Sequence, residues 1–165
     1  MKAMLDNFGF SYIGLIYLLM LWIPNAIWAK RRPEGYDPSG ESKVLLAFER
    51  VGQILSTAAI LLFTDYNPRS IEPWMAWFIV SMALMILYEI YWLRYFRSKQ
   101  TVSDFYRPII GIPAPGATLP VAAFLLLGIY GKVVWLIIAS MVLGVGHIGI
   151  HLQHIKSLSQ KAEVE

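Results

Sequence analysis

The sequence predicts an all-α, polytopic membrane protein that crosses the bilayer five times. Hydrophobic residues make up 57% of its 165 residues and charged residues 15%, and the mean hydropathy is +0.54. A soluble domain of this length would not keep so apolar a chain in solution. The charges are also spaced so that they leave stretches of roughly 20 apolar residues, the length a helix needs to cross a hydrocarbon core of about 30 Å.

We expect a single transmembrane domain over residues 1–165, with five spans. The spans are expected at about 8–29, 44–64, 73–93, 113–131 and 133–155. The residues before the first span lack a compact signal-peptide core and a cleavage site, so we expect this span to be retained. The second span contains only Glu49 and Arg50 as charges, and the third only Glu89. The last two contain none unless a histidine is protonated.

The fourth span differs from a plain helix in its Pro/Gly-rich cytoplasmic half. Four prolines and two glycines occur between Pro108 and Pro120, and proline removes an amide donor and clashes with the preceding turn. We expect a regular helix only over about 118–130, roughly 20 Å long. Two alternatives stay open: a surface loop followed by a short span, or a broken, partly re-entrant element that helps to form a pocket.

Charge predicts the orientation, because short cytoplasmic loops carry an excess of Lys and Arg. Ten basic residues fall on one side of the predicted membrane: Lys30, Arg31, Arg32, Lys43, Arg94, Arg97, Lys99, Arg107, Lys156 and Lys161. Three fall on the other: Lys2, Arg69 and Lys132. This places the N-terminus outside and the C-terminus in the cytoplasm of a cell, or inner, membrane. The excess of basic over acidic residues therefore indicates orientation and contact with the lipid bilayer, not nucleic-acid binding.

Polar residues inside the spans gather in one layer near the cytoplasmic side. At 1.5 Å per residue, Asn25, Glu49, Glu89 and His151 lie roughly 6 to 8 Å below the inner boundary. Gln53 and His147 lie about one turn deeper. An ionisable group within a span is costly and by default indicates a functional site. We therefore predict a polar pocket that binds a ligand through Asn25, Glu49, Arg50, Gln53, Tyr88, Glu89, Thr118, His147 and His151.

Helical phase predicts which faces meet. On the fifth span one stripe comprises Ser140, Gly144, His147, His151 and His154. On the second span a comparable stripe comprises Glu49, Gly52, Gln53, Ser56 and Ile60. Small residues let helices approach closely, so we expect these two faces to pack together. In the first span, Pro24 leaves the carbonyl of Met20 without its helical partner, and the neighbouring Asn25 is able to supply a replacement donor.

Other interpretations explain the same residues structurally. Glu49 and Glu89 are also interpretable as halves of buried ion pairs with Arg50 and Arg94. Arg50 lies close enough to the surface to extend its charge into water. The histidines are interpretable as cross-helix hydrogen-bonding residues, with His154 at the interface.

Three functions from different classes remain. The first is binding or transport of a small molecule, lipid or ion. The second is a membrane-embedded enzyme acting on a lipid or lipid-linked substrate. The chain has no cysteine, so a divalent metal ion would depend on histidines and carboxylates, and the His147-x-x-x-His151 spacing with Glu89 is the candidate ligand set. The third is a structural or accessory subunit. A homo-oligomer is compatible with all three.

Overall fold

The computed structural model describes residues 8–68 and 71–162, and within them the chain is helical. The elements in order are α1 (Tyr12–Lys30), α2 (Lys43–Leu61), the 3-10 turns η2 (Thr64–Tyr66) and η3 (Pro73–Met75), α3 (Ala76–Phe96), α4 (Val102–Tyr106), α5 (Pro115–Gly131) and α6 (Val134–Ala162). The described residues form two isolated β-bridges but no strand. Lys2 and Arg69, which entered the charge count, lie outside the described residues.

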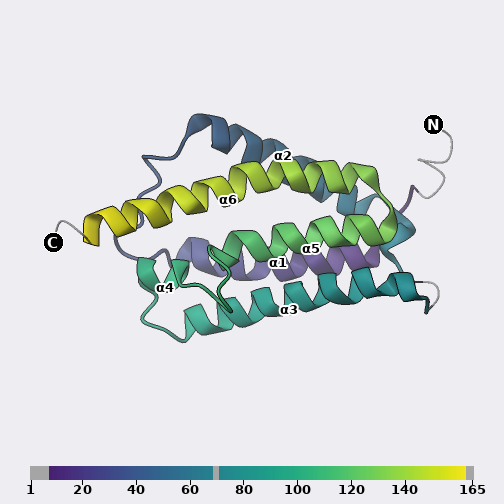
Figure 1. Cartoon of the computed structure of the whole chain (residues 1–165), viewed down its shortest axis with the longest axis horizontal. Helices are drawn as coiled ribbons and strands as arrows, with labels where there is room; N and C mark the ends of the chain where they lie inside the picture. Colours follow the sequence, from purple (N-terminus) through teal and green to yellow (C-terminus); the bar gives the residue numbers. More distant parts are fainter. Residues whose placement is uncertain (1–7, 69–70, 163–165) are drawn as a thin grey trace.

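The long helices run along one axis (Figure 1). Helix α6 packs along α2 over most of its length, while α5 lies between α6 and α3. The loop 31–42, α4 and the C-terminal part of α6 share one end of the bundle, which we call the basic end and which the charge count predicts to be cytoplasmic. Helix α1 contacts α2 and α3 much less extensively than α6 contacts α2.

In the part of the chain that the structure describes, four helices are long and apolar enough to cross a membrane: Tyr12–Lys30, Lys43–Leu61, Pro73–Phe96 and Val134–Gln160. This is the pattern of an integral, multi-pass membrane protein. Helix α5 is also apolar but has only 17 residues, about 25 Å at 1.5 Å per residue. The fifth crossing and the orientation therefore stay predictions.

The fourth predicted span takes the form of a loop followed by a short helix. Helix α5 begins at Pro115 rather than near Thr118 and continues through Pro120. The loop before it contains three residues in the left-handed region, Ile110, Gly111 and Ala114. Proline at the first helical position is favourable because its missing amide has no partner there anyway. The helix is thus longer than the proline content indicated.

Glycines allow α2 and α6 to approach closely. A Cβ on Gly52 would meet the backbone of Leu143, and one on Gly146 would meet the backbone of Glu49. The prediction that these helices pack together is confirmed, but the small residues on α6 are not the expected ones. Gly144 instead faces Val121 of α5, and the hydroxyl of Ser140 donates to Leu136 on its own helix at 2.7 Å.

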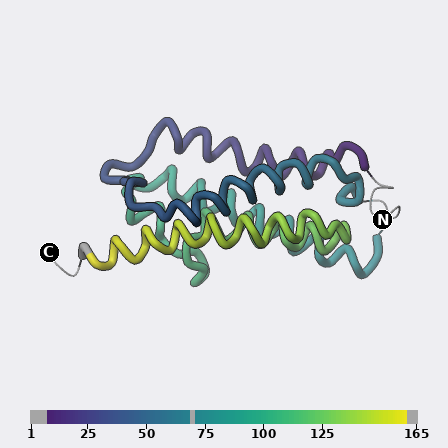
Figure 2. The backbone as a smooth tube through the Cα atoms, turned by 90° about the horizontal axis from the view of Figure 1, so that it is seen from above, coloured from purple at the N-terminus to yellow at the C-terminus, as the bar shows by residue number. Residues whose placement is uncertain are grey.

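Helices α1 and α2 are close at the end opposite the basic end and diverge from there (Figure 2). A Cβ on Gly14 would overlap the carbonyl of Ile60, and the amide of Ser11 donates to the carbonyl of Leu61 at 3.0 Å. The hydroxyl of Ser11 also caps α1 by accepting from the amide of Gly14 at 2.9 Å. The two helices are therefore held at one end and separated at the other.

Hydrogen bonds attach α1 to the rest of the bundle. The hydroxyl of Ser81 on α3 donates to the carbonyl of Ala123 on α5 at 2.6 Å. The same hydroxyl oxygen lies 3.0 Å from the Tyr17 hydroxyl of α1, and both side chains are fully buried. Since Ser81 has one proton, Tyr17 is the donor in that second bond. Three helices thus meet at one hydroxyl.

Candidate functional site

A carboxylate and an imidazole join α2 to α6 inside the bundle. Oε1 of Glu49 lies 2.5 Å from Nδ1 of His147, and the two side chains are 16% and 23% exposed. The amide of Gln53, one turn along α2, donates to the same oxygen at 3.4 Å. The alternative pairing of Glu49 with Arg50 is wrong, because neighbouring residues on a helix point about 100° apart and Arg50 is exposed.

Asn25 bridges α1 and α3 beside this pair. Its amide nitrogen donates to the carbonyl of Leu21 and to the hydroxyl of Tyr88, both at 2.7 Å. The prediction named the carbonyl of Met20 as the acceptor; the side chain reaches Leu21, one residue later. Tyr88 is fully buried, so it positions Asn25 rather than reaching the pocket itself.

The three histidines of α6 form a row toward the basic end. The rings of His147 and His151 are 4.7 Å apart between centroids. His151 lies against Phe105 and Tyr106 of α4, at 5.7 and 5.6 Å. His154 completes the row with its Nε2 at 2.9 Å from Oε1 of Glu41. The shared face predicted from the spacing is confirmed by these contacts.

Loop 31–42 supplies three residues that the predicted site did not include, Arg32, Tyr36 and Glu41. Glu41 pairs with His154, and the ring of Tyr36 stacks on His154 at 5.2 Å. The hydroxyl of Tyr36 donates to Glu41 at 3.5 Å. Burial and, next, the charge of Glu41 raise the pKa of Tyr36 to about 12, with Arg32 opposing the rise. The sequence feature that could have indicated Glu41 is the presence of an acidic residue in a loop rich in basic residues.

These groups line a polar cavity of about 380 Å³ at the basic end. Its acidic and basic side chains are those of Arg32, Glu41, Glu49, His147 and His151. Aromatic rings form much of the remaining wall, including Trp28, Tyr36, Trp92 and Phe105. The guanidinium carbon of Arg32 lies 5.6 Å from the ring centroid of Trp28, a cation–π distance. The cavity thus presents both signs of charge beside aromatic surface.

A second, larger cavity adjoins the first where α1 and α2 diverge. It has a volume of about 690 Å³ and is lined mainly by apolar side chains, such as Leu21, Trp22, Ile54, Leu62 and Phe124. The two cavities have Asn25, Gln53 and His147 in common. We call this second cavity the α1/α2 cleft. The buried hydroxyl of Ser56 lines it and has no hydrogen-bond partner among the described residues.

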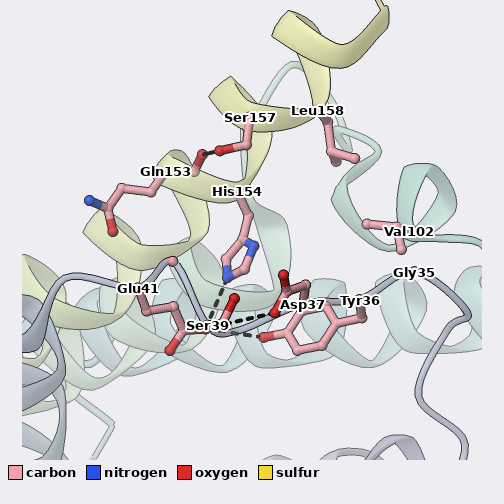
Figure 3. A pocket seen from close by; sticks show the side chains of 11 residues that line it. Gly35, Tyr36, Asp37, Ser39, Glu41, Val102, Gln153, His154, Ser157 and Leu158 are labelled. Atoms are coloured by element: carbon pink, nitrogen blue, oxygen red, sulfur yellow. Dashed lines mark hydrogen bonds and ion pairs between the residues drawn. The ribbon is translucent and has the colours of Figure 1, made fainter.

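A third pocket of about 220 Å³ lies on the other side of Tyr36 and Glu41, which line both it and the polar cavity. Figure 3 shows His154 pointing from α6 toward loop 31–42, with Gln153 and Ser157 on the same helix. The Glu41–His154 pair and the Tyr36 ring therefore form the wall between the polar cavity and the outer surface of the basic end.

Besides Tyr88, three predicted site residues do not line the polar cavity. Arg50 faces outward, and Thr118 uses its hydroxyl to donate to the carbonyl of Pro113 at 2.8 Å. Glu89 lies on the flank of α3, because Tyr88, Tyr91 and Trp92 form its buried face. Its Oε1 is buried without a hydrogen-bond partner among the described residues.

The proposed pairing of Glu89 with Arg94 does not form either. Arg94 donates instead to the carbonyls of Arg107 and Pro108, at 2.5 and 2.8 Å. The candidate metal ligands His147, His151 and Glu89 do not converge: in residues 8–68 and 71–162 no three His, Asp or Glu side chains are placed to hold one ion. The three residues were predicted at a similar depth in the membrane, but they do not face the same point around the bundle axis.

Comparison with known proteins adds no relative to this picture. No protein-family model, no curated protein sequence and no solved structure matches the chain. The long apolar helices identify the class of protein, an integral membrane protein. Its activity has to be argued from the polar cavity and the cleft beside it.

Proposed function

We propose that this protein binds a small amphipathic ligand, whose polar head occupies the polar cavity and whose apolar part lies in the α1/α2 cleft. The observation that supports this most directly is that the two cavities have Asn25, Gln53 and His147 in common. Ligand sites in proteins are mostly apolar concavities with a few convergent polar groups. Such a combination suits a molecule with two unlike ends.

The packing of α1 explains how the ligand reaches the cavity. Helices α1 and α2 are fastened together near Gly14 and Ile60 but separate toward the basic end. Trp22, Ile54 and Leu62 line the cleft and are also partly exposed on the surface of the bundle. In a bilayer this surface faces lipid. We infer that the ligand enters sideways from the membrane, between the two helices.

The two other functions have less support. A metal-dependent enzyme needs a ligand set, and the candidate set does not converge among the described residues. A purely structural role leaves a polar cavity of about 380 Å³ without a purpose. Transport would require, in addition, a route past the wall formed by Tyr36 and Glu41.

The absence of cysteine from the sequence permits a direct test of binding. In the variant Gln53→Cys the only thiol lies where the cavity meets the cleft. We would purify it in a maltoside detergent and measure labelling by a water-soluble maleimide. The competitors are twelve-carbon amphiphiles with anionic, cationic, zwitterionic or neutral heads. We expect at least one of them to protect the thiol saturably.

Val51→Cys is the matched control, because Val51 lies two residues away on α2, is 50% exposed and does not line either cavity. An amphiphile that merely coats the apolar surface would protect this position as well. If no amphiphile protects Gln53→Cys in preference to Val51→Cys, the proposed function is wrong.

A further inference from the structure

We propose that the ligand is a zwitterionic, phospholipid-like amphiphile, bound with its phosphate at Arg32 and its ammonium group at Glu41 and Glu49. This inference rests on the proposed function and names the chemical class of the ligand. It follows from the signs of charge in the polar cavity and from the apolar cleft next to them.

Charges of both signs line the polar cavity together with Tyr36. Glu41, Arg32 and Glu49 all act on its hydroxyl electrostatically, and all three line the polar cavity. Arg32 forms no ion pair with a carboxylate in the described residues and is held instead over the ring of Trp28. A guanidinium matches the geometry of a phosphate through paired N–H donors. It is therefore a free anion-binding group at the cavity.

The two carboxylates are the cation-binding groups. Glu49 uses Oε1 for His147 and Gln53, and Glu41 uses Oε1 for His154 and Tyr36. Oε2 of either carboxylate forms no hydrogen bond within residues 8–68 and 71–162, so each carboxylate can attract a cationic group by its charge. The aromatic rings of Trp28 and Tyr36 also line this space, and aromatic faces attract ammonium and quaternary ammonium groups.

Ligands with a single sign of charge fit this cavity less well. An anionic head would meet Arg32 but also two carboxylates, and a cationic head would meet the carboxylates but also Arg32. A neutral head would leave all of these charges without a new partner while excluding the water that solvates them. A head that carries a phosphate and an ammonium group compensates both signs at once.

The α1/α2 cleft has room for the apolar chain of the proposed ligand. Its walls are mainly apolar, and its volume of about 690 Å³ is of the size of drug-like ligand sites. An acyl chain placed there would leave the bilayer without entering water. The head would then lie at the depth where lipid head groups meet the basic end.

The test uses the Gln53→Cys protection assay with four probes that share a twelve-carbon chain: dodecylphosphocholine, dodecyl phosphate, dodecyltrimethylammonium and dodecanol. We expect dodecylphosphocholine to protect at about tenfold lower concentration than any of the others, the ratio for the loss of one charge contact worth about 1.4 kcal/mol. Equal or better protection by a probe with one charge or none overturns the inference while the proposed function stands. Protection by no probe removes both.

Two variants that each lack one charge test the phosphate site and the ammonium site separately. In the Gln53→Cys background, Arg32→Gln should weaken protection by dodecylphosphocholine about tenfold and improve that by dodecyltrimethylammonium. Glu41→Gln should also weaken protection by dodecylphosphocholine but should improve protection by dodecyl phosphate. Arg31→Gln and Glu34→Gln are the matched controls, because each removes a charge of the same sign from an exposed residue that does not line the polar cavity. They should leave the order of the four probes unchanged.

Folding is checked in parallel, because Glu41 also pairs with His154. The thermal midpoint of each variant is measured in the same detergent, and Glu49→Gln provides a second carboxylate variant. If Arg31→Gln shifts the ranking as much as Arg32→Gln, the phosphate site is not at Arg32 and the inference is wrong.

Discussion

Nδ1 of His147 lies 2.5 Å from Oε1 of Glu49, at the level where Gly146 brings α6 against the backbone of α2. The pair is at once a contact between helices and part of the wall of the polar cavity. It is partly shielded from water, so the charge on Glu49 depends on its neighbour for compensation.

We predict strong coupling between these two residues. His147→Ala leaves the carboxylate with only the 3.4 Å hydrogen bond from Gln53 and should lower the free energy of unfolding by about 1–3 kcal/mol. Glu49→Ala should have a similar effect, and the double variant should lose at least 0.5 kcal/mol less than the sum, an approximate threshold for residues in contact. Thermal unfolding in detergent compares the stability of the unchanged protein, the two single variants and the double variant. Arg50→Ala serves as the control, and additive effects would argue against the pairing.

Close packing of α2 and α6 gives the second prediction. Gly146→Ala places a methyl group against the backbone of Glu49, where no side chain can move aside. The cost of overpacking, about 1–3 kcal/mol, should exceed the gain in helix propensity of about 1 kcal/mol. The thermal midpoint should therefore fall. Gly40→Ala, with no atom within 4 Å of the added Cβ, should leave it unchanged; a similar fall in both would contradict the packing argument.

A third prediction concerns Ser81, where α1, α3 and α5 meet. Ser81→Ala leaves the buried Tyr17 hydroxyl without its acceptor and should cost about 1–3 kcal/mol. Ser159→Ala is the matched control, because its hydroxyl also donates to a backbone carbonyl, Ile155 at 3.2 Å, but in an exposed part of α6. Thermal midpoints of the two variants decide the matter, and equal shifts would refute the role of the buried hydroxyl.

Thr101 and Asp104 form a capping box at the start of α4, in which the side chain of each accepts from the backbone amide of the other. This motif predicts a pH dependence. The pKa of Asp104 is lowered by hydrogen bonds from the amide and then the hydroxyl of Thr101. Because a lowered pKa means that the folded state favours the carboxylate, this contribution is present at neutral pH and is lost as the pH falls from about 5 through the lowered pKa. Asp104→Asn should therefore reduce the thermal midpoint near pH 6, and the reduction should become smaller as the pH falls below about 4. A difference that is constant with pH would contradict this assignment.

Local signals were enough to predict most of the fold. The helices follow from the distance between charges, since a long apolar stretch has one stable form in a bilayer. The meeting of α2 and α6 followed from the polar and small residues on one stripe of each. The start of α5 at Pro115 was missed because the proline count outweighed the fact that proline is tolerated in a first helical turn.

The candidate site was predictable only in part. Asn25, Glu49, Gln53, His147 and His151 were named from depth and phase, and all five line the polar cavity. Depth alone misplaced Glu89, because it says nothing about position around the bundle axis. Glu41, Tyr36 and Arg32 come from a loop, whose path no periodicity describes.

The sequence by itself determined the class of protein, the helices and the row of imidazoles, because these depend on composition and on spacing along one helix. Only the tertiary structure decided the partner of each ionisable residue, the divergence of α1 from α2 and the joining of the polar cavity to the apolar cleft. Those features depend on how helices rotate and tilt against one another. That arrangement results from many weak packing contacts between residues far apart in the chain.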